Sequence, residues 1–180
     1  MDILEGSFSE DDRLKPSNPY SAAKAAAEML IRSYGRTYGV PYMISRSTNN
    51  YGPRQYFEKL IPKIVQSIRN NQKVPIHGDG SYVRDWIHVS DNVYAIYKII
   101  EYIENTGEIN TVFNISSECL MSNLEVVNLI KDRLNIIENI VEFVPNRSGQ
   151  DVRYAISNKK LRELTGWKPA FEKMSVADIL

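Results

Sequence analysis

Tyr20 and Lys24 lie four positions apart in a stretch, residues 20–38, whose alanines and long side chains favour a helix. That spacing places both side chains on one face of the helix. An ammonium beside a phenol stabilises the phenolate, so it lowers the tyrosine pKa from about 10. The pair therefore predicts a general base that works near neutral pH. Such pairs are common on helices and the chain has 11 tyrosines, so an ordinary surface pair is the alternative.

Amide and guanidinium side chains form a second group of candidates, which are singled out by the family resemblance set out below and not by their own spacing. Asn49 and Asn50 are adjacent in the turn-rich segment 46–55, and a carboxamide both donates and accepts hydrogen bonds. Arg84 and Arg147 carry planar guanidinium groups, which pair with phosphate oxygens through two parallel bonds. The alternatives are turn residues that bond their own backbone for the asparagines, and solvated charges for the arginines.

Several motifs around these residues follow one another in a fixed order. They are residues 16–25 (PSNPYSAAKA), 46–55 (RSTNNYGPRQ), 58–62 (EKLIP), 78–80 (GDG), 84–89 (RDWIHV), 147–154 (RSGQDVRY) and 166–169 (GWKP). Each motif alone is modest, but the set is specific. From about Phe8 to Phe171 the chain resembles the nucleotide-sugar 4,6-dehydratases, the dTDP-glucose and UDP-glucose enzymes among the extended short-chain dehydrogenases.

The resemblance implies a reaction and a role for each matching residue. Enzymes of this family bind NAD, oxidise the sugar at C4, eliminate water across C5 and C6, and return the hydride to C6. Tyr20 would take the proton of the C4 hydroxyl, and Lys24 would hold the nicotinamide ribose. Asn50 would face the cofactor and Asn49 the sugar nucleotide. The other implied substrate contacts are Lys59, Leu60, Pro75, Ile76, His77, Arg84, Asn114, Arg147, Gln150 and Tyr154.

Two departures from the family pattern qualify this expectation. The chain has no glycine-rich dinucleotide fingerprint, and no Thr-Asp-Glu segment precedes the part that matches. We therefore expect a fragment that is inactive alone, with a complementing N-terminal half or a second copy of the chain as partner. Gln150 stands where many relatives carry histidine, which leaves open whether a dTDP or a UDP sugar is the substrate.

Helix and strand patterns alternate along the sequence, which predicts an α/β fold with some parallel pairing. The expected class is a partial Rossmann-type fold that lacks its first half and carries a small C-terminal substrate-binding region. Residues 1–72 are expected to be the remainder of the NAD-binding domain, and residues 73–180 mainly the nucleotide-sugar-binding region. The expected strands are 41–45, 74–77, 83–89, 111–115 and 140–144, and the expected helices are 20–38, 57–70, 90–104, 122–134 and 159–164. Residues 46–55 are expected to be a loop. The expected helix caps are Ser17 or Asn18 for the first helix, Ser90 or Asp91 for the third, and a capping box of Ser122 and Glu125 for the fourth.

Composition excludes several other classes. With 22 basic and 22 acidic residues the formal net charge is zero, which argues against nucleic acid and anionic membranes as partners. The single cysteine, Cys119, excludes an internal disulfide, and His77 and His88 lack metal-ligand spacing. No apolar run reaches the ~18 residues of a membrane helix. A cytoplasmic protein without a bound metal is the simplest expectation.

Two other functions remain open on the sequence. One is another reaction of the same superfamily, such as a nucleotide-sugar 4-epimerase or decarboxylase. The run from Asn49 to Gln55 joined to residues 58–62 favours the dehydratase over it. The other is a non-catalytic remnant that binds a nucleotide sugar, because retained motifs do not prove a retained reaction.

Overall fold

The computed structural model describes residues 4–175, in which helices alternate with short strands. The α/β class expected from the sequence is confirmed. The helices are α1 (Pro19–Tyr38), α2 (Leu60–Arg69), α3 (Val89–Thr106), α4 (Asn123–Arg133) and α5 (Lys159–Thr165). The strands are β1 (Met43–Ser47), β2 (Asn49–Tyr51), β3 (Val74–His77), β4 (Val83–His88), β5 (Thr111–Ile115), β6 (Leu120–Ser122), β7 (Val141–Val144) and β8 (Arg153–Tyr154).

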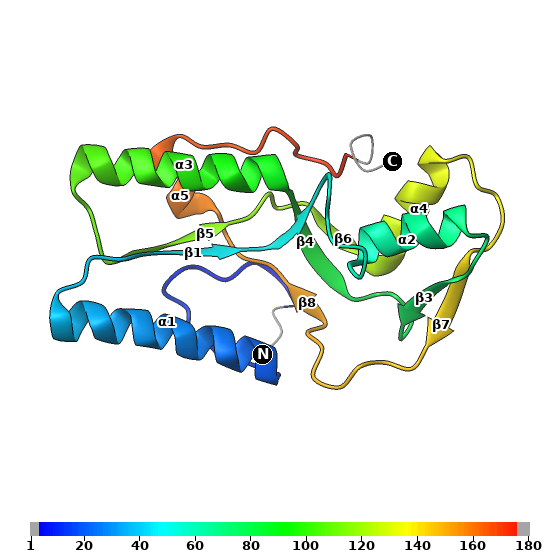
Figure 1. Ribbon diagram of the computed structural model, residues 1–180, viewed down its shortest axis with the longest axis horizontal. Coiled ribbons are helices and arrows are strands. Elements are labelled where there is room, and N and C mark those ends of the chain that lie inside the picture. Colours follow the sequence, from blue (N-terminus) through cyan, green and yellow to red (C-terminus); the bar gives the residue numbers. More distant parts are fainter. Residues whose placement is uncertain (1–3, 176–180) are drawn as a thin grey trace.

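The strands form three small sheets. β1 pairs with β5 in parallel, and β3 pairs with β7 in parallel. Between these pairs, β4 is hydrogen-bonded to β2 and β8 in parallel and to β6 in antiparallel orientation. Figure 1 shows an elongated molecule in which α1 and α3 lie on opposite sides of the β1–β5 pair, while α2 and α4 lie at the other end beside β3 and β7.

Two helices begin where the sequence predicts. Asn18 caps α1, because its Oδ1 accepts the N–H of Ser21 at 2.9 Å. In return, Ser21 Oγ accepts the N–H of Asn18 at 3.2 Å. Ser122 and Glu125 form the predicted capping box at α4. α1 ends at Gly39, whose φ of 66° is left-handed and suits glycine. Local chemistry therefore fixes both ends of the helix that carries Tyr20.

The start of α3 differs from the prediction. Ser90 and Asp91 are expected caps, but the cap is His88, whose Nδ1 accepts the Ser90 N–H at 3.3 Å. The Asp91 carboxylate is occupied elsewhere, since it accepts the N–H groups of residues 170 and 171 at 3.0 Å each. The prediction of a Ser90 or Asp91 cap is wrong because a tertiary contact uses Asp91.

The segment 46–55 also differs, because part of it is strand rather than loop. β1 continues to Ser47, and Asn49–Tyr51 forms β2, which pairs with Trp86–His88 of β4. Tyr51 is 1% exposed, and its hydroxyl accepts the N–H of Ser175 at 3.0 Å. Burial and pairing partners distant in sequence override the local preference of this polar segment for turns.

Two hydrophobic cores support the fold. The first lies among β4, β5, α3 and α5 and includes Phe113, Ile115 and Trp167. The second packs α2 and α4 against β3, around Ile64, Val74 and neighbouring side chains. The expected division at residue 72 does not coincide with these cores, because α2 packs in the second core while α3, β5 and α5 pack in the first. The domain division stays a prediction.

α1 contributes almost nothing to either core. Its one buried residue is Glu28. Its large apolar side chains lie at the surface instead. Its large exposed side chains are Tyr20, Met29, Leu30, Ile31, Tyr34 and Tyr38, at 41% to 76% exposure. Within residues 4–175, none of the helices has both the length and the apolar character of a bilayer-spanning segment.

Asp85 is a buried carboxylate in the middle of the central sheet. It is 1% exposed, and its Oδ2 has no hydrogen-bond partner among the described residues. The Ser117 hydroxyl lies 3.4 Å from Oδ1 but donates at 2.6 Å to the Trp86 carbonyl, so it is a weak partner for the carboxylate. Burial therefore raises the pKa of Asp85 from 3.8 to about 6.

This pKa shift predicts a stability change with pH. Between about pH 4 and pH 6 the native state binds more protons at Asp85 than the unfolded chain does, so stability falls as pH rises through this window. The Asp85→Asn side chain is neutral at every pH. Between pH 4.5 and pH 7 the free energy of unfolding of this variant is therefore expected to fall by roughly 2 kcal/mol less than that of the unaltered protein. Urea unfolding of both proteins at the two pH values measures it. Equal pH slopes for the two proteins would contradict the assignment.

Candidate functional site

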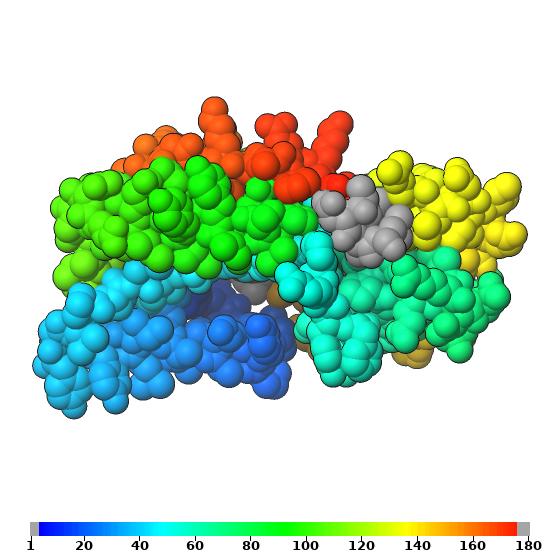
Figure 2. Space-filling model, turned by 45° about the horizontal axis from the view of Figure 1, so that its top comes forward, coloured from blue at the N-terminus to red at the C-terminus, as the bar shows by residue number. Residues whose placement is uncertain are grey.

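The predicted acid–base pair lies near the start of α1, on a surface open to solvent. Tyr20 is 76% exposed and Lys24 is exposed one turn further along. Figure 2 shows the surface hollowed between α1, in blue, and the cyan segment around residues 50–60.

The segment 147–154 runs to this end of α1. Ser17 Oγ donates to Asp151 Oδ1 at 2.8 Å, and Asn18 Nδ2 donates to the Gly149 carbonyl at 3.1 Å. Between these contacts lies Gln150, whose Oε1 is buried and without a hydrogen-bond partner among residues 4–175. The two contacts bring the predicted substrate residue Gln150 beside the helix that carries Tyr20.

The same segment begins at a second pair of predicted residues. Arg147 Nε donates to His77 Nε2 at 2.9 Å, although 70 positions separate the two in sequence. His77 ends β3, which pairs with β7, and β7 leads directly into Arg147. Parallel pairing of two short strands therefore brings an arginine and an imidazole together at one edge of the molecule.

The central sheet aligns three further predicted residues. Tyr154 of β8 is in register with Arg84 of β4, and Asn49 of β2 is in register with Trp86, two positions after Arg84. Residues in register on parallel strands, and residues two apart on one strand, face the same side of a sheet. Asn49, Arg84 and Tyr154 therefore share one face.

Tyr154 links this face to α1. Burial raises the pKa of Tyr154, the nearby Arg46 guanidinium opposes the shift, and the charges of Asp151, Asp85 and Tyr20 add to it. Tyr20 is thus close enough to Tyr154 for their charges to interact.

Asn50 presents a buried amide oxygen. Its Nδ2 donates to Ser47 Oγ at 3.0 Å and to the Thr48 carbonyl at 3.1 Å, which fixes the orientation of the carboxamide. Asn50 Oδ1 is buried and has no partner within the described chain. An acceptor held in this way fits an incoming amide N–H donor.

Lys59, another of the predicted substrate-binding residues, lies at the start of α2. Lys59 is its N-cap residue and is exposed, and its side chain makes no capping hydrogen bond. Leu60, the first residue of the helix, packs against the second core. The positive end of the helix dipole and the Lys59 ammonium together favour a bound anion.

Three predicted residues are less accessible than the rest. Asn114 is 0% exposed, and its Nδ2 donates to the Phe8 carbonyl at 3.2 Å. Its side chain therefore holds the N-terminal loop, and a ligand contact would require that loop to move. Ile76 is 2% exposed and belongs to the second core, so its side chain does not face the site, while Pro75 before it is half-buried.

The sequence gives no sign of the contact that attaches α1 to the sheet. Glu28 is 7% exposed, and both of its oxygens accept from Arg46, at 2.7 and 3.0 Å. Arg32, one turn along the helix, donates to the same carboxylate at 2.9 Å. Arg46 also donates to the Glu10 carbonyl at 3.0 Å. In the sequence, Glu28 and Arg32 resemble an ordinary i, i+4 ion pair on a helix surface. The main partner of Glu28 is Arg46, which lies 18 positions away.

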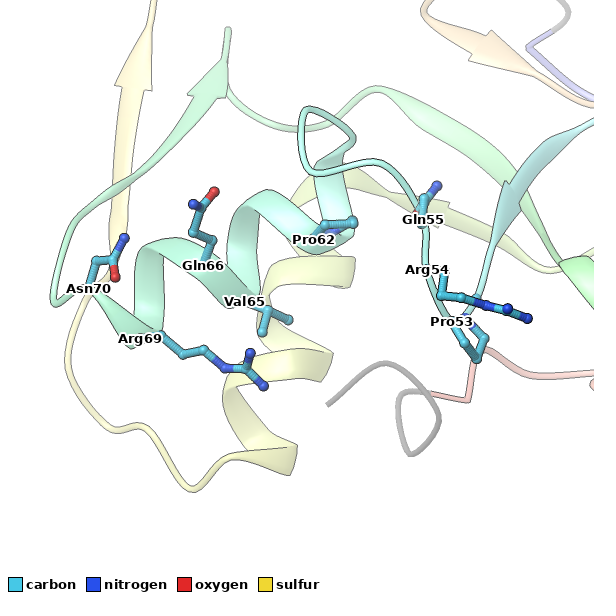
Figure 3. A pocket seen from close by; sticks show the side chains of 9 residues that line it. Pro53, Arg54, Gln55, Pro62, Val65, Gln66, Arg69 and Asn70 are labelled. Atoms are coloured by element: carbon cyan, nitrogen blue, oxygen red, sulfur yellow. The ribbon is translucent and has the colours of Figure 1, made fainter.

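The sequence also gave no indication of a cavity of about 230 Å³ beside the site. Figure 3 shows it between the loop after β2 and helix α2. None of the predicted site residues lines it. Its lining residues are Gly52, Pro53, Arg54, Gln55, Pro62, Val65, Gln66, Arg69 and Asn70.

Comparison with known proteins gives consistent matches over nearly the whole chain. Residues 2–178 match the family model described as GDP-mannose 4,6 dehydratase. The low-salt glycan biosynthesis protein Agl12 of Haloferax volcanii is 46% identical over 93% of this chain and 53% of its own length. The dTDP-glucose 4,6-dehydratase of Haemophilus influenzae is 37% identical over 94% of this chain and 52% of its own length. The chain thus spans about half the length of the curated relatives it matches.

Solved structures of two nucleotide-sugar enzymes have the same fold as this chain over most of its length. DesIV, a dTDP-glucose 4,6-dehydratase from Streptomyces venezuelae crystallised with NAD, is 34% identical, with a TM-score of 0.88 over 98% of this chain and 53% of that one. A UDP-glucose 4-epimerase from Thermotoga maritima, crystallised with UDP-glucose, is 28% identical, with a TM-score of 0.83 over 94% of this chain and 54% of that one.

Proposed function

Because this chain belongs to the GDP-mannose 4,6-dehydratase family, we propose that it is the nucleotide-sugar-binding half of a nucleotide-sugar 4,6-dehydratase that acts on dTDP-glucose or UDP-glucose. One observation carries the proposal. The segment 147–154 joins the Arg147–His77 pair to the helix that carries Tyr20. A diphosphate held at one end of the segment places its sugar at the other.

Each residue then has a task that suits its chemistry. The Arg147 and Arg84 guanidinium groups bind diphosphate oxygens, and Asn49 binds the sugar nucleotide. Tyr20 takes the proton of the C4 hydroxyl, and Lys24 lies one helical turn further along the same face of α1.

NAD is the cofactor that fits this arrangement, and when bound it would accept and return the hydride. Asn50 Oδ1, buried and without a partner in the described chain, would accept from the nicotinamide carboxamide. Lys24 would bind the nicotinamide ribose. The exposed apolar face of α1 would pack against a complementing N-terminal half or a second copy of the chain.

A 4-epimerase is the second candidate, supported by the likeness to the Thermotoga maritima epimerase. Both reactions begin with removal of the C4 hydroxyl proton, so Tyr20 and Lys24 serve either. The product decides between them. Turnover by this chain together with an NAD-binding half yields a 4-keto-6-deoxy sugar in one case and a C4-inverted sugar in the other.

Arg147→Ala tests the binding proposal on the chain itself. Charged hydrogen bonds contribute about 1.5–3 kcal/mol, so we expect a loss of roughly tenfold or more in affinity for dTDP-glucose or UDP-glucose. Titration calorimetry measures the change. Arg36→Ala, which removes an exposed arginine near the far end of α1, is the control and should leave affinity unchanged. Failure of the unaltered chain to bind either sugar nucleotide would refute the proposed function.

A further inference from the structure

The imidazole of His77 is held at both nitrogens. Nδ1 lies 2.9 Å from the Pro145 carbonyl oxygen, and Nε2 lies 2.9 Å from Arg147 Nε. A carbonyl oxygen only accepts, and the arginine Nε–H only donates. The ring is therefore neutral and carries its proton on Nδ1, so that Nε2 offers a lone pair to the guanidinium.

This contact determines how Arg147 is presented. Its Nε–H is used by His77, which leaves the two terminal amino groups, for which the described chain provides no hydrogen-bond partner. The backbone is fixed as well, because the Arg147 N–H donates to Asn146 Oδ1 at 3.1 Å and Asn146 Nδ2 bonds the Tyr82 hydroxyl. An exposed arginine held at its base has less conformational entropy to lose when an anion binds.

We infer that His77 is a positioning residue that orients the Arg147 guanidinium for the diphosphate of the nucleotide sugar. The inference rests on the proposed function and adds a task to it. A phenyl ring at position 77 would offer a face to a nucleobase but no acceptor to Arg147. Stacking on a base therefore requires only a flat ring at position 77, whereas orienting Arg147 requires a hydrogen-bond acceptor there.

Two substitutions separate these roles. His77→Gln replaces the ring by a carboxamide whose oxygen accepts from Arg147, whereas His77→Phe keeps a flat ring and removes the acceptor. If His77 orients Arg147, H77F weakens binding of UDP or dTDP about fivefold to tenfold. It leaves the weak binding of uridine or thymidine unchanged, and H77Q recovers most of the loss. Calorimetry for the diphosphates and NMR titration for the nucleosides measure these affinities.

The Arg147→Ala background provides the matched control. There H77F should cause no further loss of diphosphate affinity, because the group that His77 orients is gone. Full retention of affinity in H77F with loss in H77Q would overturn the inference in favour of stacking. A loss in H77F that persists in the R147A protein would also overturn it, because His77 would then act on a group other than Arg147.

A spectroscopic measurement needs no ligand. In ¹⁵N-labelled protein the neutral His77 ring should carry its proton on Nδ1, and a proton on Nε2 would overturn the inference whatever the chain binds. Absence of any binding of UDP and dTDP by the unaltered chain would refute the proposed function and, with it, the role of His77. Normal binding combined with the wrong tautomer refutes the role of His77 alone.

Discussion

Tyr20→Phe is expected to lower turnover by about 10²–10⁴-fold when the chain works together with an NAD-binding half. The hydroxyl is the only group that the substitution removes, and its oxygen is the proposed acceptor of the C4 hydroxyl proton. Affinity of the chain for the sugar nucleotide should change little, because the substitution leaves the guanidinium groups of Arg147 and Arg84, the proposed diphosphate contacts, in place. Steady-state kinetics and calorimetry on the same proteins measure the two quantities.

Tyr38→Phe is the matched control for this prediction. It makes the same chemical change on the same helix, at a residue that is 71% exposed where Tyr20 is 76% exposed. Turnover of the Tyr38 variant should equal that of the unaltered protein. A Tyr20 variant that turns over within threefold of the unaltered enzyme would remove Tyr20 from the acid–base role.

Glu28→Ala is expected to lower the free energy of unfolding by about 3 kcal/mol. The substitution leaves the Arg46 side chain, 15% exposed, without the carboxylate that both Nε and a terminal amino group contact. Burial acts to raise the pKa of Glu28, but the bonds from Arg46 and Arg32 outweigh it and lower the pKa overall. The stabilising contribution is therefore present at neutral pH and is lost as pH falls through the lowered folded-state pKa. Urea unfolding measures the change.

Arg32→Ala separates the two ion pairs of Glu28. The Arg32 side chain is 39% exposed, so its removal should cost less than about 1 kcal/mol. If both substitutions destabilised the protein equally, the attachment of α1 would not depend on the buried contact with Arg46. A loss of stability in Glu28→Ala that does not weaken as pH falls would also contradict it.

Local signals in the sequence were enough to predict where several elements begin and end. Asn18 and Ser122 are good capping residues with partners three positions on, and Gly39 supplies a left-handed residue at the end of α1. The resemblance to a known family then supplied the list of site residues. Of these, His77 and Arg147 form a direct contact, and the register of the central sheet aligns Asn49, Arg84 and Tyr154.

The remaining features depend on partners distant in sequence. β2 forms in a segment of turn residues because β4 pairs with it, and His88 replaces Asp91 as a cap because Asp91 holds the chain at residues 170–171. Neither Glu28 nor His77 has a neighbour in sequence that reveals its main partner. Charged and polar contacts between distant segments leave no periodic pattern, so the sequence alone does not predict them.

The anchors of the segment 147–154 also set a length. Arg147 is held by His77, and Gly149, two residues later, is held by Asn18 at the start of the Tyr20 helix. Two peptide steps span at most about 7 Å, and each inserted residue would add up to about 3.6 Å. If the diphosphate binds at Arg147 as proposed, a residue inserted between Arg147 and Gly149 would move the phosphate-binding group relative to the helix that carries Tyr20.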